Sequence, residues 1–161
     1  MEKAITTAIL IIASIIAALA LVNTVMPAMG RSSSALLIAN KDAAERIKTD
    51  IEIITAVGDA TANTITVWVK NIGTQVITPV NSSDVILTAP SPNGVKRLSY
   101  VSGCSTGDCW DFAFEGSPSP TAWSRAVTVK FTLTLTDVTT GVHSITISTF
   151  NAVSATKDFS V

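Results

Sequence analysis

The N-terminal segment constrains this chain more than any other part of it. No charged side chain occurs between residues 4 and 30, and residues 4–22 are mainly Ile, Leu and Ala with a few Thr and Ser. A helix of about 20 such residues is about 30 Å long, which matches the hydrocarbon core of a bilayer. We therefore predict an apolar helix over residues 1–26 that lies in lipid or among other helices.

Apolar side chains cover all sides of this predicted helix, which is typical of burial in lipid or in a core of helices. One stripe recurs at steps of three and four residues, and we expect the helix to assemble through its members: Ile5, Ile9, Ile12, Ile16 and Leu19. A second stripe, formed by Thr7, Ser14 and Ala18, permits a close approach of helices. Ordinary use of small residues explains that second stripe equally well.

A cleaved secretory signal is the alternative interpretation of the N-terminal segment. Signal peptides end their apolar core after about 7–15 residues at a small-x-small site. Here the apolar stretch is longer and passes smoothly into a second helical pattern, although residues 27–30, Pro-Ala-Met-Gly, offer a weak cleavage-like site. We favour a retained helix and leave the signal hypothesis open.

The second helical pattern covers residues 31–55 and is amphipathic. Ala44, Ile47, Ile51 and Ile54 recur at helical spacing, and Arg46 lies four residues from both Asp42 and Asp50. A proline inside a helical pattern can kink the helix without ending it. Because apolar periodicity continues beyond Pro27, we expect a kink there at most. We predict one continuous or gently kinked helix over residues 1–55, apolar over 4–26 and amphipathic over 31–55, followed by a second unit at residues 56–161.

From about residue 59 the hydrophobic period changes to two. Ile65, Val67 and Val69 alternate with polar residues and Trp68, and residues 127–135 alternate in the same way. Other candidate strands are separated by turns rich in Gly, Pro and Asn, and they cover residues 75–78, 84–88, 96–101, 142–150 and 153–161. About seven short strands with regular turns indicate a β-sandwich. The predicted fold class is α+β, with a long N-terminal hydrophobic helix followed by an Ig-like antiparallel β-sandwich.

Composition and charge argue against several classes of function. Charged residues make up 14% of the chain, the net charge is -1 and no basic run occurs, so we expect no nucleic-acid partner. The one histidine, His143, shares a predicted strand face with Ile145 and Ile147, and we expect it to be structural. No Ser/His/Asp set and no phosphate-binding glycine loop is evident. We predict no catalytic site, no metal, no cofactor and no enzymatic activity.

A Ser/Gly-rich loop contains both cysteines, Cys104 and Cys109. Their spacing is short for a metal site, and no third cysteine is available. We predict a local disulfide formed outside the cytoplasm, with free thiols as the alternative. The nearby carboxylates of Asp108, Asp111 and Glu115 offer oxygen ligands for Ca²⁺, but their spacing fits no known loop motif and we favour a solvated acidic loop.

Two further features near this loop leave alternatives open. Trp110, Phe112 and Phe114 alternate, which predicts a strand whose apolar face packs in the core or meets a neighbouring subunit. Asn81 begins an Asn-Ser-Ser sequon in a predicted loop, where it would accept an N-linked glycan if the chain is exported. A chance match explains a lone sequon equally well.

Three segments carry a family resemblance: the Ile/Ala-rich N-terminal helix, residues 68–73, and residues 141–149 with Asn151. Together they resemble the archaeal flagellins (archaellins), the filament subunits of the archaellum, over essentially the whole chain. The Ile/Ala-rich N-terminal helix is similar to that of type IV pilins. Residues 68–73, Trp-Val-Lys-Asn-Ile-Gly, look like the Val-Lys-Asn-x-Gly signature that opens archaellin β-domains. Residues 141–149 followed by Asn151 are similar to the closing strands of that family. Only Met1-Glu-Lys3 precedes the apolar helix, so the basic leader of archaellin precursors has been removed or processing differs.

The resemblance implies a structural subunit of a helical filament used for swimming. The implied partners are many copies of the same chain, the membrane before assembly, a prepilin-type peptidase and the archaellum motor and assembly machinery. Helices would form the filament core and β heads the outer sheath of an extracellular filament. Two alternatives share this architecture: a minor membrane-anchored stator or envelope subunit of the archaellum, and a type IV pilus-like adhesin.

Overall fold

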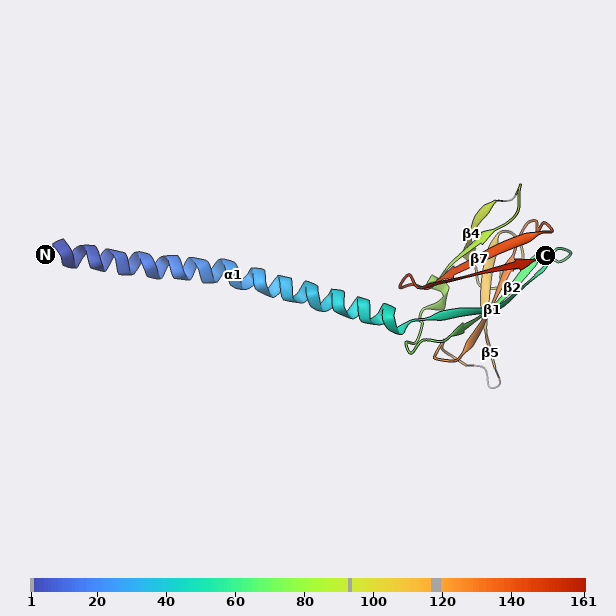
Figure 1. The fold of residues 1–161 in the computed structure, drawn as a ribbon, viewed down its shortest axis with the longest axis horizontal. Helices are drawn as coiled ribbons and strands as arrows, with labels where there is room; N and C mark the ends of the chain where they lie inside the picture. Colours follow the sequence, from blue (N-terminus) through green and yellow to red (C-terminus); the bar gives the residue numbers. More distant parts are fainter. Residues whose placement is uncertain (1, 93, 117–119) are drawn as a thin grey trace. The chain divides into compact units, whose positions relative to one another are not determined.

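A computed structural model describes residues 2–92, 94–116 and 120–161 (Figure 1). It divides into two compact units, Met1–Ala43 and Ala44–Val161, which are described separately below. The elements are α1 (Glu2–Lys48), β1 (Ile51–Asp59), β2 (Thr64–Asn71), the 3-10 turn η1 (Val80–Ser82), β3 (Asp84–Thr88), β4 (Val95–Tyr100), β5 (Cys109–Glu115), β6 (Thr128–Thr134), β7 (Val142–Ser148) and β8 (Ser154–Ser160). The predicted order of one long helix followed by a β region is confirmed.

The helix α1 has 47 residues and continues through Pro27 and Gly30. At 1.5 Å per residue it is about 70 Å long. Proline lacks the amide hydrogen that would bond one turn back, so one helical hydrogen bond is lost at Pro27. The continuous apolar periodicity on both sides of Pro27 explains why the helix does not end there.

The predicted helical extent up to residue 55 is wrong at its C-terminal end, because α1 ends at Lys48 and β1 begins at Ile51. Ile51 and Ile53 are buried while Glu52 and Ile54 are exposed, so the segment follows a period of two. Ile51 pairs with Asn71, and Ile53 pairs with Val69. Burial of these β-branched side chains in the sheet outweighs continuation of the helix.

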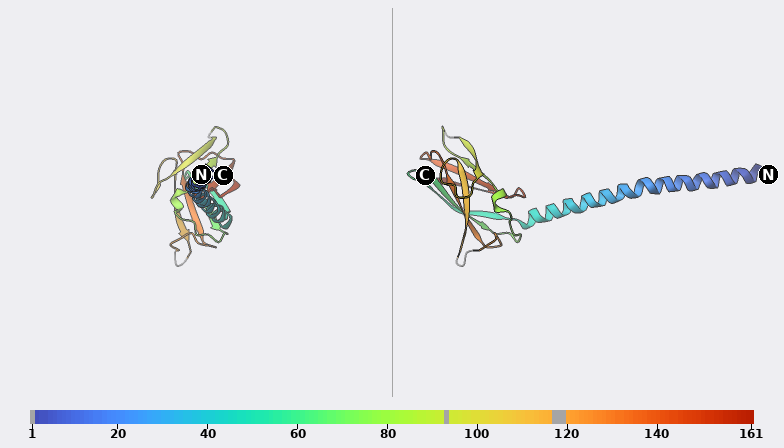
Figure 2. Two further views of the ribbon diagram at one scale, coloured as in Figure 1. Left: turned by 90° about the vertical axis from the view of Figure 1, so that its left-hand side faces the viewer. Right: turned by 180° about the vertical axis from the view of Figure 1, so that it is seen from behind.

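The eight strands form one curled sheet in the order β1-β2-β6-β5-β4-β3-β7-β8. Figure 2 shows these strands from two further sides. The pairs are antiparallel except β4 and β5, which are parallel at Ser99–Cys109 and Tyr100–Trp110. The predicted antiparallel β-sandwich is confirmed apart from this one pair, in which the 101–108 connection returns the chain beside β4 in the same direction.

The two end strands of the sheet approach each other, so the sandwich is nearly closed. Lys157 of β8 donates from Nζ to the carbonyl oxygen of Ile54 in β1 at 2.8 Å. An ammonium group at this seam satisfies a carbonyl that would otherwise lack a strand partner. The sequence contains no signal for this contact, since residues 54 and 157 are far apart along the chain.

Aromatic residues fill the centre of the sandwich. Trp110, Trp123 and Phe131 are fully buried. The ring centroid of Phe131 lies 5.3 Å from that of Trp110 and 5.8 Å from that of Trp123. The aromatic strand predicted at residues 110–114 is confirmed as β5, with Trp110 in the core and Phe112 and Phe114 half-buried against it.

The strand expected at residues 75–78 is reduced to one isolated bridge between Ile77 and Trp123. The amides of Thr74 and Gln75 bond instead to the carbonyl oxygen of Lys48 at 2.8 and 3.0 Å. The cap of α1 therefore uses the donors that a strand would have directed to a neighbour.

Candidate assembly and anchoring site

The predicted assembly stripe lies on α1 and is open to solvent in this single chain. Its members, Ile5, Ile9, Ile12, Ile16 and Leu19, are between 58% and 61% exposed. Other apolar residues of the same segment are similarly exposed, for example Leu10 at 68% and Leu21 at 65%. Exposure therefore identifies an apolar surface around the whole helix and does not single out one stripe.

The few hydroxyl groups on this surface are bonded within the helix. Thr7 donates to the carbonyl oxygen of Lys3, Ser14 to that of Ile11 at 2.7 Å, and Thr24 to that of Ala20 at 3.0 Å. A hydroxyl that bonds a carbonyl one turn earlier adds little cost on transfer to an apolar environment. By length and composition α1 is able to cross a membrane.

The apolar surface continues past the length that one bilayer covers. Leu36, Leu37 and Ile38 are 63%, 71% and 62% exposed. Leu37 lies about 50 Å along the helix axis from Ala4, whereas a hydrocarbon core is about 30 Å thick. Lipid that covers the N-terminal segment therefore does not also cover these side chains.

The three carboxylates of the Cys104–Cys109 region bind three different partners. Asp108 lies 3.0 Å from Lys96 Nζ, Asp111 accepts from the Gly103 amide at 2.8 Å, and Glu115 lies 3.6 Å from Lys130 Nζ. Within residues 2–92, 94–116 and 120–161, no group of three or more His, Cys, Asp or Glu side chains is placed to hold a metal ion. The structure therefore does not bring the possible Ca²⁺ ligands together.

Asp108 ties the disulfide loop to the segment after β6. Its Oδ1 accepts from the amide and the hydroxyl of Thr136 at 3.0 and 2.8 Å. The Thr136 amide, its hydroxyl and Lys96 lower the pKa of Asp108 below its ordinary value of 3.8, against a smaller rise from burial. Because the folded pKa is lowered, the contact stabilises the fold above the unfolded pKa, and this stabilisation is lost as pH falls through the folded pKa.

Cys104 and Cys109 are joined by a disulfide, with their Cα atoms 6.0 Å apart. We predict that non-reducing mass spectrometry of the purified protein finds neither thiol alkylated, whereas both are alkylated after reduction. The closed loop is short, so reduction should lower the free energy of unfolding by only about 2 kcal/mol. Alkylation of both cysteines without reductant would contradict the prediction.

The remaining candidate residues occupy separate places. His143 is buried in β7, its Nδ1 lies 3.1 Å from the Gly141 carbonyl oxygen, and its ring stacks on Phe159 at 5.5 Å. It packs against the core as the strand pattern predicts. Asn81 is exposed in η1, where an oligosaccharide could reach it, and its glycosylation stays a prediction.

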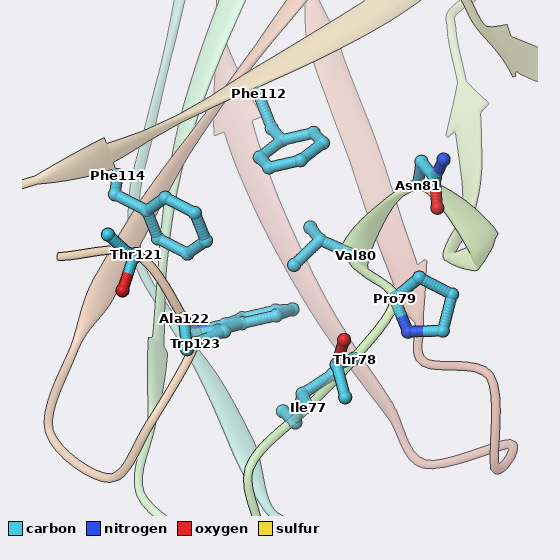
Figure 3. A pocket seen from close by; sticks show the side chains of 10 residues that line it. All are labelled: Ile77, Thr78, Pro79, Val80, Asn81, Phe112, Phe114, Thr121, Ala122 and Trp123. Atoms are coloured by element: carbon cyan, nitrogen blue, oxygen red, sulfur yellow. The ribbon is translucent and has the colours of Figure 1, made fainter.

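A pocket of about 250 Å³ opens beside η1 (Figure 3). Val80, Phe112, Phe114 and Trp123 surround the space, and Asn81 lies at its edge. Among the described residues that line it, none has an ionisable side chain. The aromatic and aliphatic side chains give the pocket room for an apolar group.

Comparison with known proteins places these features in a family. The sequence pattern of the archaeal-type flagellin family matches residues 2–159. This chain belongs to the archaeal-type flagellin family. The match runs from the start of α1 into β8, so it covers nearly the whole chain.

One relative and two solved structures are similar to this chain. An uncharacterized protein of Archaeoglobus fulgidus is 29% identical over 133 residues, covering 80% of this chain and 78% of the relative. The archaellum periplasmic stator protein FlaG from Sulfolobus acidocaldarius has a TM-score of 0.56 at 20% identity, over 69% of this chain and 99% of that one. The FlaF and FlaG stator complex from the same organism gives 0.55 at 20% identity, over 68% of this chain and 87% of that one. At this identity the likeness concerns the fold alone.

Sequence reasoning missed a set of polar residues at the C-terminal end of α1. Asn71 and Thr49 are buried although their side chains are polar. The local signal for them is the Asn-x-Gly spacing at residues 71–73, which we interpret from the sequence as part of a family resemblance and not as a structural feature.

Proposed function

We propose that this chain is a structural subunit of an archaellum-type helical filament used for swimming, with no catalytic activity of its own. The observation that carries the proposal is the length of the apolar surface on α1. Leu36, Leu37 and Ile38 lie beyond the reach of a bilayer that holds residues 4–24, and they need another cover. Identical helices packed around one another supply such a cover along the whole helix.

Assembly would move α1 from one apolar environment to another. Lipid already shields residues 4–24, so transfer of that segment into a bundle gains little hydrophobic free energy. Covering Leu36, Leu37 and Ile38 does remove apolar surface from water, at about 25 cal/mol per Å². Packing between helices and contacts between β domains would add to this.

The proposed route uses the partners that the archaellin resemblance implies. The chain enters the membrane by α1, is trimmed by a prepilin-type peptidase and is extracted into the filament by the archaellum machinery. The helices form the core, and the unit containing β1–β8 forms the sheath, where its Thr and Ser side chains face water. A separate ATPase supplies the energy for rotation.

A membrane-anchored stator subunit is the second candidate. The fold likeness to FlaG, over 99% of that chain, favours it. In this role α1 would stay in lipid, and Leu36, Leu37 and Ile38 would be covered by other envelope components or remain in water.

A charged residue introduced into the part of α1 beyond the bilayer core distinguishes the filament function from the stator function. We expect Leu37→Asp to leave membrane insertion intact but to remove the subunit from sheared extracellular filaments and to abolish swimming, because the charge enters a dry helix bundle. Asn40→Asp is the matched control, since it adds the same charge at a polar position of α1 and should assemble normally. Immunoblots of sheared filaments and membranes measure both variants. Normal filaments from Leu37→Asp, or a wild-type chain found only in membranes, would favour the stator.

A further inference from the structure

The two segments that resemble archaellin strands meet at the end of α1. Residues 71–75 begin at the last residue of β2, residues 149–151 follow β7, and both segments bond to residues 48–50. All of these residues belong to the compact unit Ala44–Val161. We call residues 71–75 the capping turn.

The capping turn supplies donors to the helix terminus. The last carbonyl groups of a helix have no donor within it. The carbonyl oxygen of Lys48 accepts from the amides of Thr74 and Gln75 at 2.8 and 3.0 Å. The carbonyl oxygen of Asp50 accepts from the amides of Ile72 and Gly73, both at 3.0 Å. Peptide groups on both sides of Thr49 are therefore held by the same turn.

Asn71 fixes the capping turn to the core. Its side chain is fully buried, and Nδ2 donates to the carbonyl oxygens of Gln75 at 2.8 Å and Trp123 at 2.9 Å. Its Oδ1 accepts from the amide of Gly73 at 3.0 Å. An alanine here would remove all three hydrogen bonds at a fully buried position and would take the Nδ2 donor from the Gln75 carbonyl, which is more costly than the loss of an exposed hydrogen bond.

Gly73 is required by a close approach of two backbones. A Cβ atom at this position would overlap the carbonyl oxygen of Lys48 and the amide nitrogen of Asp50. Both obstacles are main-chain atoms, so a rotamer change cannot relieve the overlap. Any larger residue must separate the turn from residues 48–50.

A side-chain relay holds Thr49 from the other side. Asn151 Nδ2 donates to Thr49 Oγ1 at 2.6 Å, and Thr49 Oγ1 donates to the carbonyl oxygen of Glu45 at 2.8 Å. Thr149 Oγ1 in turn donates to Asn151 Oδ1 at 2.6 Å. Thr49 and Thr149 are both only 4% exposed.

We propose that Asn71, Gly73 and Asn151 are positioning residues that couple the last turn of α1 to the β domain. Force that reaches Lys48 along the backbone would enter the sheet through hydrogen bonds on both sides of Thr49, instead of passing through a free linker. The coupling serves a filament subunit and a membrane-anchored stator alike. It therefore does not rest on the choice between those two functions.

Hydrogen exchange on the full chain in detergent micelles tests the coupling. Asn71→Ala and Gly73→Ala should raise amide exchange at residues 44–50 and 71–76 about tenfold or more, as expected when buried hydrogen bonds open locally. Residues 142–148 in β7 should keep wild-type exchange. Asn151→Ala should raise exchange at residues 44–50 by a smaller factor. Asn81→Ala, the same change at an exposed asparagine, should leave all three segments unaltered.

Each possible exchange pattern either supports or overturns the proposed coupling. Wild-type protection of residues 44–50 in the Asn71 and Gly73 variants would overturn it. An equal rise in residues 142–148 would also overturn it, because these residues would then serve the fold of the β domain as a whole. If both variants fail to fold, Asn151→Ala decides: a selective rise at residues 44–50 supports the coupling, and no rise overturns it.

Discussion

Ile12→Asp is expected to abolish filament assembly. Ile12 is 58% exposed on the apolar segment of α1. In the proposed filament role its side chain would face lipid before assembly and neighbouring helices afterwards. An aspartate at the centre of a membrane helix costs about 3 kcal/mol. An unpaired charge in a dry bundle costs several kcal/mol, and the cost recurs in each subunit.

Counting filaments by electron microscopy and measuring the subunit in sheared fractions would check this result. Ile12→Val is the matched control, because it keeps a β-branched apolar side chain and should assemble at close to wild-type yield. The β domain of the Ile12→Asp chain should keep its melting transition, since Ile12 belongs to the other compact unit. A normal filament yield from Ile12→Asp would refute assembly through this part of α1.

Phe131→Ala should have the largest effect on the stability of the β domain. Phe131 is fully buried in β6 between Trp110 and Trp123, with ring centroids 5.3 and 5.8 Å away. Removing a buried phenylalanine ring leaves a cavity and costs about 3–5 kcal/mol. For a domain with about 5–15 kcal/mol of total stability, this is a large fraction.

Urea denaturation of the full chain in detergent, followed by tryptophan fluorescence, measures this loss. Phe150→Ala is the matched control, because Phe150 is 43% exposed and its removal should cost less than about 1 kcal/mol. Similar urea midpoints for the two variants would show that Phe131 contributes no more to the stability of the β domain than an exposed phenylalanine does.

The hydrophobic periods along the chain predicted most of its elements. The alternation at residues 64–70 and 127–135 became β2 and β6, and the alternating aromatics became β5. These predictions succeeded because each strand buries one face. Apolar and polar residues therefore alternate within each strand, and this alternation is visible whichever strands it pairs with. The strand expected at residues 75–78 is reduced to the Ile77–Trp123 bridge, and the Gln75 amide bonds the end of α1 instead, which no local pattern indicates.

The candidate site was only partly predictable. The apolar surface of α1 follows from residue type alone, since nearly every side chain between residues 4 and 22 is apolar or small. The partners of the acidic residues do not follow from residue type. Asp108 bonds Thr136, Asp111 bonds Gly103, and Glu115 pairs with Lys130. Their spacing allowed a shared cation, but Asp108 lies in the loop before β5 while Asp111 and Glu115 lie on β5, and each carboxylate has a different partner.

The sequence by itself determined the division into an apolar helix and a β domain, because the preference of side chains for water or an apolar environment is a local property. The tertiary structure alone decided where α1 ends. Residues 51–55 carry both a helical spacing and an alternating one, and pairing of Ile51 and Ile53 with Asn71 and Val69 selects the strand. The same pairing brings residues 71–75 onto Lys48 and Asp50. Contacts between segments so far apart in sequence depend on the folded sheet, and no local pattern records them.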